Sequence, residues 1–255
     1  TYDRLEVDAV TFPSGITITD KGNKANLCMT CHQGRESKKT IDDAIAAKKF
    51  SFRNVHYLPS ASVKKGTVAK VGYEYDGKVY AAEALFHGQC TDCHNAKLTK
   101  HSFLPKDNEL CTSACHAPTP IHMIRMVHLL DYDNDGNTSE PLSDELGGLA
   151  AALLKQMQIA TKLGAAKNGI CYDEHAYPYF FIDSDEDGVC SAAEAKSSNR
   201  YAPWTPALMK AAHNYQISRK DPGAWAHNFD YMAQLLFDSV EDLGGDMNAL
   251  GFIRP

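Results

Sequence analysis

Apolar residues recur at helical spacing near the end of the chain. Five of them lie three or four residues apart: Trp225, Phe229, Met232, Leu236 and Val240. Residues at this spacing share one face of a helix, which can then pack against a core. The pattern predicts a helix that starts at Asp221-Pro222, runs to about Leu243 and ends at Gly244-Gly245.

Patterns elsewhere predict further helices and one hairpin. Helices are expected over residues 40–50, 143–163 and 205–217. Each begins at a Thr or Ser that can cap its first turn. Residues 71–80 alternate around Asp76-Gly77, a pair that favours a two-residue hairpin. The fold class is therefore expected to be mainly α, with large irregular loop content and a small β-hairpin.

Paired cysteines followed directly by a histidine occur three times in the first half of the chain. The motifs are Cys28-Met29-Thr30-Cys31-His32, Cys90-Thr91-Asp92-Cys93-His94 and, one residue longer, Cys111-Thr112-Ser113-Ala114-Cys115-His116. Two cysteines at this spacing can each form a thioether with one porphyrin, and the adjacent histidine can ligate its iron. The motifs predict three covalently bound haem c groups, with His32, His94 and His116 as proximal ligands.

Other uses of paired cysteines explain the motifs less well. A zinc knuckle needs a fourth ligand at each site, and a redox dithiol or a structural disulfide has no use for the adjacent histidine. One such motif is a moderate signal, but three in one chain favour haem strongly. We therefore expect a multihaem cytochrome c, organised around covalently bound haems.

Two of the eight cysteines, Cys171 and Cys190, lie outside the motifs. Thioether attachment of haem takes place outside the cytosol, where disulfides also persist. We therefore expect these two cysteines to pair, with two buried free thiols as the alternative. No signal peptide is visible, so the chain is expected to be a processed secreted protein, either extracellular or periplasmic.

The motifs also suggest how the chain is organised. Its 255 residues suffice for one large domain or two modest ones. We expect a tri-haem-attachment region over residues 1–120 and a helical region over residues 121–255, packed as one unit. No apolar run approaches the length of about 18 residues that suggests a membrane helix, so no membrane span is expected. For this chain of net charge −6 we also expect no nucleic-acid partner.

Acidic residues of the second half gather in two loops with the spacing of calcium sites. In the second loop, carboxylates occupy positions 1, 3, 5 and 12, with glycine at position 6. This spacing wraps oxygen ligands around a calcium ion, and the glycine permits a sharp turn. The sequence predicts a complete EF-hand-like loop with the ligands Asp183, Asp185, Asp187, Val189 and Glu194.

The first acidic loop begins in the same way but ends differently. Its expected ligands at the first positions are Asp131, Asp133, Asp135 and Asn137. Position 12 is Leu142, which cannot close a calcium site. The closing carboxylate is therefore expected from Glu140, or from Asp144 or Glu145 after a short insertion. A second calcium site is predicted here.

The remaining ligand of each iron has to come from elsewhere in the chain. Eleven histidines include the three proximal ones, and this excess favours bis-histidine ligation over methionine. His87 lies three residues before Cys90, His227 lies off the apolar face of its helix, and His56 lies in a segment expected to be extended. The distal candidates are therefore His56, His87 and His227, with His122 in reserve.

Several segments resemble extracytoplasmic multihaem c-type cytochromes of anaerobic, metal- or partner-respiring microbes. They are residues 28–37, 72–78, the Asp-rich loop at 131 and residues 221–228, and the resemblance covers most of residues 25–245. It implies electron transfer, with His56, His87 and His227 in segments that resemble the family's ligand segments. The longer third motif departs from the usual pattern. Some similar cytochromes polymerise into extracellular filaments, in which one subunit donates a histidine to its neighbour's haem.

Two classes of function compete for such a chain. One is an electron conduit of low-spin, bis-histidine haems that passes electrons to other redox proteins or to extracellular acceptors. The alternative is a multihaem reductase, which needs one iron with an open position and nearby acid–base groups. The excess of ligands, and the lack of a Cys-x-x-Cys-Lys motif that would mark a substrate haem, favour the conduit and no enzyme activity. A homopolymer with haem ligation between subunits is a further arrangement of the same conduit.

Overall fold

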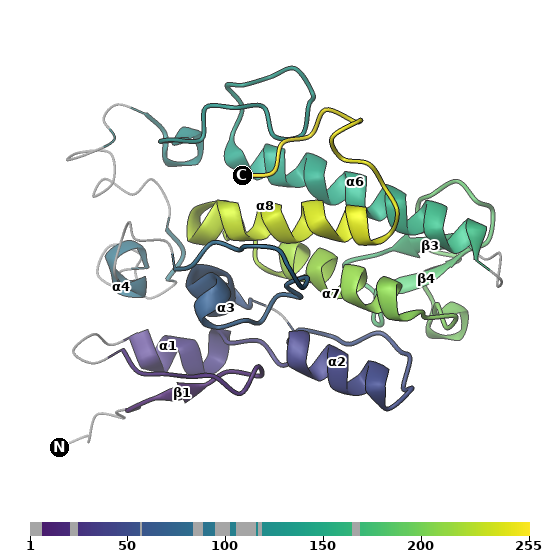
Figure 1. Ribbon diagram of the computed structural model, residues 1–255, viewed down its shortest axis with the longest axis horizontal. Helices are drawn as coiled ribbons and strands as arrows, with labels where there is room; N and C mark the ends of the chain where they lie inside the picture. Colours follow the sequence, from purple (N-terminus) through teal and green to yellow (C-terminus); the bar gives the residue numbers. More distant parts are fainter. Residues whose placement is uncertain are drawn as a thin grey trace.

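The computed structural model describes residues 7–20, 25–56, 58–83, 89–94, 103–105, 116, 119–164 and 169–255. Within these ranges helices dominate, accompanied by two short antiparallel hairpins (Figure 1). The architecture is therefore mainly α with a small β component, as the sequence predicts.

Three long helices form the centre of the molecule. They are α6 (Leu142–Leu163), α7 (Pro206–Lys220) and α8 (Ala224–Asp242), and each packs against the other two. The predicted apolar face of α8 is in the core, with Trp225 partly buried at its edge and the rest fully buried: Phe229, Met232, Leu236 and Val240. The periodic pattern thus identified the helices that build the core.

The ends of these helices follow from local chemistry. Thr205 caps α7, because its hydroxyl accepts a hydrogen bond from the Leu208 N–H at 3.2 Å. α7 runs three residues beyond the predicted end at Ile217. α8 ends before Gly244, whose φ of +84° suits a residue without a side chain.

A kink divides the first turn of α8 from the rest of the helix. Asn228 has non-helical angles, with φ −169° and ψ 86°. Its side chain accepts a hydrogen bond from the Tyr231 N–H at 3.1 Å and donates one to the Ala82 carbonyl at 2.8 Å. Asn228 therefore acts as the N-cap of the long part of the helix. The preceding turn, which carries His227, lies at an angle to the rest of α8.

The shorter helices come mostly from the first half of the chain. They are α1 (Ala25–His32), α2 (Lys38–Ala46), α3 (Ser60–Lys65) and α4 (Cys90–Cys93), with 3₁₀ segments at Gly66–Val68, Ile121–Met123 and Ser197–Asn199. α2 begins two residues earlier than expected, because Ser37 and not Thr40 is its cap. The Ser37 hydroxyl accepts from the Thr40 N–H, and the Thr40 hydroxyl accepts from the Ser37 N–H, a reciprocal capping box.

Both β-hairpins lie outside the segment where the sequence predicted one. β1 (Val10–Thr11) pairs with β2 (Thr17–Ile18), and β3 (Gly169–Tyr172) pairs with β4 (Phe180–Asp183), each antiparallel. The register of the second pair sets Gly169 opposite Asp183 and Tyr172 opposite Phe180. β4 therefore leads directly into the second acidic loop.

The hairpin predicted over residues 71–80 is wrong. The chain does turn at Asp76-Gly77, but its flanking residues form no ladder. Helix side chains take up the backbone groups instead: Asn214 bonds both the N–H and the carbonyl of Tyr73, and Gln234 accepts from the Ala81 N–H. Tertiary hydrogen bonds from α7 and α8 have replaced the cross-strand pairs that alternation alone suggested.

Two clusters of buried apolar side chains hold the chain together. The larger one takes residues from both sides of position 120, including Ile41 and Val55 as well as α6, α7 and α8. The smaller one surrounds α1 and centres on Phe12 and Met29. The main core is thus shared by the two predicted regions. Their division at residue 120 stays a prediction about where haem is attached.

Among the described residues, none of the helices is both long enough and apolar enough to cross a membrane.

Candidate haem centres and acidic loops

The first two cysteine motifs, 62 residues apart in sequence, meet in the fold. α1 carries the first motif and α4 carries the second, and the two helices pack against each other at one end of the molecule (Figure 1). Hydrogen bonding between the two thiols lowers the pKa of Cys28 to about 6 and raises that of Cys90. Cys28, Cys31, Cys90 and Cys93 form no disulfide. A disulfide therefore occupies none of these four sulfurs.

Backbone carbonyls orient two of the three proximal candidates, His32 and His94. His32 Nδ1 lies 2.9 Å from the Leu58 carbonyl oxygen, and His94 Nδ1 lies 2.5 Å from that of Phe103. A carbonyl oxygen only accepts hydrogen bonds, so Nδ1 carries the proton in each ring. The unprotonated Nε2 is then the nitrogen able to bind a metal. Metal-ligating histidines are usually held in this way.

His94 and His227 lie near each other. Their ring centres are 6.1 Å apart, and the ring planes meet at 34°. Metal–imidazole bonds of about 2.0–2.1 Å on either side of an ion, with about 1 Å more from nitrogen to each ring centre, would separate two ring centres by about 6 Å. The distance between these two rings is therefore that of two imidazoles able to share one metal ion.

Three local features orient the His227 imidazole. Its Nδ1 lies 2.7 Å from the carboxylate of Asp221, which is itself 1% exposed. Burial disfavours the charged imidazolium, but the Asp221 carboxylate outweighs burial, and the pKa of His227 is raised. Gly223 leaves room for the ring, because a Cβ there would lie 2.7 Å from Cε1 of His227. The kink at Asn228 completes the arrangement.

For the other histidine candidates, the structure shows only their local surroundings. His56 is not extended as expected, because its φ is +75°, in the left-handed region. Its N–H donates to the Asn54 side chain at 2.9 Å, a local turn that accounts for the difference. His122 is exposed within the 3₁₀ segment Ile121–Met123, and His116 is half-buried. The remaining expected site residues lie outside the described ranges: His87, Cys111 and Cys115.

The predicted disulfide is present. Cys171 and Cys190 are joined, with their Cα atoms 5.2 Å apart. Cys171 lies in β3 and Cys190 lies within the second acidic loop. The bond therefore ties this loop to the neighbouring strand.

The second acidic loop brings three of its predicted carboxylates together. Oxygens of Asp183, Asp185 and Glu194 lie within 4.8 Å of one another. Asp183 is 2% exposed, and its Oδ1 has no hydrogen-bond partner among the described residues. Loop amides bond two others, since Asp187 accepts from the Val189 N–H at 2.7 Å and Glu194 from the Ser184 N–H. A buried oxygen without a donor, beside two more carboxylates, suits a cation.

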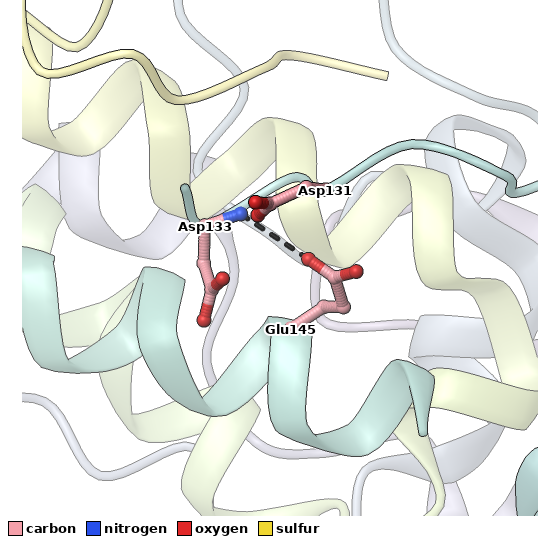
Figure 2. Close-up of side chains that lie close together, drawn as sticks. All are labelled: Asp131, Asp133 and Glu145. Atoms are coloured by element: carbon pink, nitrogen blue, oxygen red, sulfur yellow. Dashed lines mark hydrogen bonds between the residues drawn. The ribbon is translucent and has the colours of Figure 1, made fainter. Parts of the chain in front are cut away.

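The first acidic loop folds over the start of α6. Figure 2 shows Glu145 reaching up from that helix toward Asp131 and Asp133, and oxygens of the three lie within 4.8 Å of one another. A Cβ at Gly148 would lie 1.7 Å from an Asp133 oxygen, so a glycine there allows the loop to approach the helix. Asn137 braces the loop by accepting from the Ser139 N–H at 3.1 Å.

Glu145 is already fully engaged by the protein itself. It is completely buried, and its Oε1 pairs with the Arg125 guanidinium at 2.6 Å. Its Oε2 accepts from the Tyr132 N–H at 2.6 Å and the Asp133 N–H at 3.2 Å. Arg125 also donates to three carbonyls around it. Sequence reasoning missed Arg125, because its role depends on the folded path of the loop.

Glu140, in contrast to Glu145, is not fully engaged by the described residues. Its Oε1 is buried without a hydrogen-bond partner among the described residues, and it gathers with Asp133 and Asp135. Burial, followed by repulsion from these two carboxylates, raises the pKa of Glu140 to about 7. Burial likewise raises the pKa of Asp133 to about 6. Crowded carboxylates of this kind are stabilised by a divalent cation. Among the expected closing ligands, Glu140 keeps a buried oxygen without a partner among the described residues, whereas Arg125 and backbone amides already engage both oxygens of Glu145.

Comparison with known proteins identifies a class of haem proteins to which the chain is similar. The homologues of the chain are polyheme c-type cytochromes. Two of them are the C-type polyheme cytochromes OmcB and OmcC of Geobacter sulfurreducens. OmcB of strain DL-1 / KN400 is 33% identical over 245 residues, and OmcC is 31% identical over 253 residues. Each similarity covers 85% of this chain.

The chain spans only 30% of the length of these relatives. No family profile matches the chain, and no solved structure matches it either. The similarity therefore supports a multihaem c-type cytochrome at the level of cofactor and class.

Proposed function

We propose that this chain is an electron-transfer module that binds three haem c groups, each held by two histidines. The observation that carries the proposal is the His94–His227 pair, 6.1 Å apart beside the second motif. An iron held by two imidazoles has no open position for a substrate. When bound, haem supplies a one-electron couple, and the protein supplies attachment, orientation and electrostatics.

The contact between α1 and α4 supports electron passage between the first two centres. Thioether bonds at Cys28 and Cys90 would fix two porphyrin edges side by side, because these thiols touch. Electron tunnelling falls steeply with distance, so a short gap between edges favours rapid transfer. The polyheme cytochrome relatives support the same reading.

The number of haems can be tested directly. The intact mass, after extraction of loosely held haem with acid, should exceed that of the chain by three haem units. An excess of two units would contradict attachment at the third motif.

The ligand assignment calls for a variant and a matched control. His227→Ala should convert one of three low-spin irons to high spin in optical and EPR spectra. His175→Ala is the control, because the side chain of His175 is 88% exposed. Three low-spin irons in His227→Ala would contradict ligation by His227, and a high-spin iron in the native protein would favour the reductase instead.

We further propose that both acidic loops hold structural calcium. The buried unpartnered oxygens of Asp183 and Glu140, and the crowding around each, support this. The first site would use Asp131, Asp133, Asp135, Asn137 and Glu140; the second would use Asp183, Asp185, Asp187, Val189 and Glu194. Chelation should lower the melting temperature and leave the haem spectrum unchanged. A change of spin state on chelation would instead make calcium a regulator.

The proposed setting is the periplasm or the cell exterior, as the Cys171–Cys190 disulfide supports. Partners would be other redox proteins or extracellular electron acceptors. In a homopolymer, a histidine of one chain, with His56 or His122 as candidates, would complete a haem of the next. Electron microscopy of native material tests this arrangement. Monodisperse single molecules with only low-spin irons would exclude it.

A further inference from the structure

Asp221 sits where the supports of two haem ligands meet. It lies between α7 and α8 and is almost completely buried. Its Oδ2 binds His227 Nδ1, while its Oδ1 accepts from the Ser60 hydroxyl at 3.0 Å and the Gly223 N–H at 3.2 Å. None of these partners is an Arg or a Lys, so none offsets the carboxylate's charge. That charge is directed mainly at His227.

The same short region also holds the support of His32. The Leu58 carbonyl receives His32 Nδ1, and the Leu58 N–H donates to the Lys220 carbonyl at 2.9 Å. Lys220 directly precedes Asp221, and Ser60 follows Leu58 by two residues. The two ligand supports are therefore locked to each other. The groups that bind Nδ1 of these histidines differ in charge. Nδ1 of His32 and of His94 binds a neutral carbonyl, whereas Nδ1 of His227 binds a carboxylate.

We propose that Asp221 is a positioning residue that makes His227 a stronger ligand and lowers the reduction potential of the iron bound between His94 and His227. A carboxylate draws the Nδ1 proton toward itself, which raises the electron density at Nε2. A more basic ligand stabilises the ferric ion over the ferrous ion. On reduction one electron enters, and the Nδ1 proton stays between the two residues. The inference rests on the proposed ligation by His227.

The test is a spectroelectrochemical titration of the complete three-haem protein and its variants. Asp221→Asn removes the charge and keeps one oxygen acceptor for His227, while its NH2 group replaces the oxygen that accepts from Ser60 and Gly223. It should shift one of the three midpoints to a more positive value, while the irons stay low-spin. Asp221→Glu should restore a midpoint close to that of the native protein. An unshifted midpoint in Asp221→Asn would overturn the inference.

Asp230→Asn is the matched control. Asp230 lies on the same helix and holds another histidine, with His128 Nε2 at 2.7 Å. The variant removes the same charge from a histidine that is not proposed to ligate iron. It should leave the midpoint affected by Asp221→Asn in place. An equal shift would show that distant charge, and not the ligand, sets the potential.

Ser60→Ala provides an independent measurement if Asp221→Asn folds poorly. It removes the hydroxyl that donates a hydrogen bond to the Asp221 carboxylate. The carboxylate then interacts more strongly with His227, and the same midpoint should shift to a more negative value. A positive shift or none would contradict the inference. His227→Ala separates the two levels of failure. If His227→Ala loses a low-spin iron but Asp221→Asn shows no midpoint shift, the role of Asp221 is overturned and ligation by His227 still stands.

Discussion

At the scale of single residues, the chemistry of the sites depends on which polar atoms are already engaged. His213 shows this for a histidine: it is fully buried, its Nε2 binds the Val71 carbonyl at 2.8 Å, and it lies among core residues of α7. His227 was singled out from the sequence because it lies off the apolar face of its helix. The role of Asp221 could not be predicted, since Asp-Pro-Gly before a helix reads simply as a helix start.

The two glutamates of the first acidic loop should respond in opposite ways to loss of charge. Glu140→Gln should raise the melting temperature of the metal-free protein at pH 8, because it removes repulsion from Asp133 and Asp135. It should also weaken the stabilisation that calcium provides. Thermal unfolding with and without calcium measures both effects.

Glu145→Gln is the contrasting variant. It removes the carboxylate charge that pairs with the buried Arg125 guanidinium, and breaking a buried ion pair typically costs about 3–5 kcal/mol. The loss should be similar with and without calcium. Stabilisation of Glu145→Gln to the native level by calcium would mean that Glu145 is the closing ligand after all.

At the scale of elements, periodicity and caps predicted the long helices because those signals are local. α6, α7 and α8 needed only apolar spacing and a Ser, Thr or Pro near each start. The hairpin at 71–80 failed because Asn214 and Gln234, far along the chain, satisfy its backbone. The packing of α1 on α4 was also missed. Nothing local in the sequence indicates which distant helices meet.

Two adjacent glycines of α6 offer a test of how the helix and the acidic loop fit together. Gly148→Ala places a methyl group against the Asp133 carboxylate, so we expect destabilisation of about 1–3 kcal/mol and weaker calcium binding. Gly147→Ala meets no atom within 4 Å and should stabilise the helix by up to about 1 kcal/mol. Chemical denaturation and calorimetric titration provide the two measurements. Equal effects of the two substitutions would contradict the close approach of loop and helix.

At the scale of the whole molecule, crowded carboxylates should make the metal-free protein more stable as the pH falls from 8 to about 6.5. The folded pKa of Glu140, about 7, lies above the unfolded value of about 4.3, so folding is favoured as pH falls through 7. Asp133 adds to this gain as pH falls through its folded pKa of about 6 toward the unfolded value of about 3.9. Burial lowers the pKa of His213 to about 4, below an unfolded value of about 6.5, so His213 offsets part of the gain below pH 6.5.

Melting temperatures measured in chelator from pH 8 to pH 5 check this prediction. Calcium should remove the decline on the alkaline side, because it replaces protons among the crowded carboxylates. With calcium bound, the destabilisation by His213 below about pH 6.5 is no longer offset by these carboxylates. A metal-free stability that rises steadily from pH 5 to 8 would contradict the crowding around Glu140.

The contact between α1 and α4 also constrains how the protein can mature. Cys28 and Cys90 belong to different motifs, yet folding brings their thiols together. In an oxidising compartment, adjacent thiols that carry no other bond are prone to form a disulfide. A chain that folded before it received its haems would thus be exposed to cross-linking of its first two attachment sites. Attachment of both haems before the chain folds would avoid this cross-link.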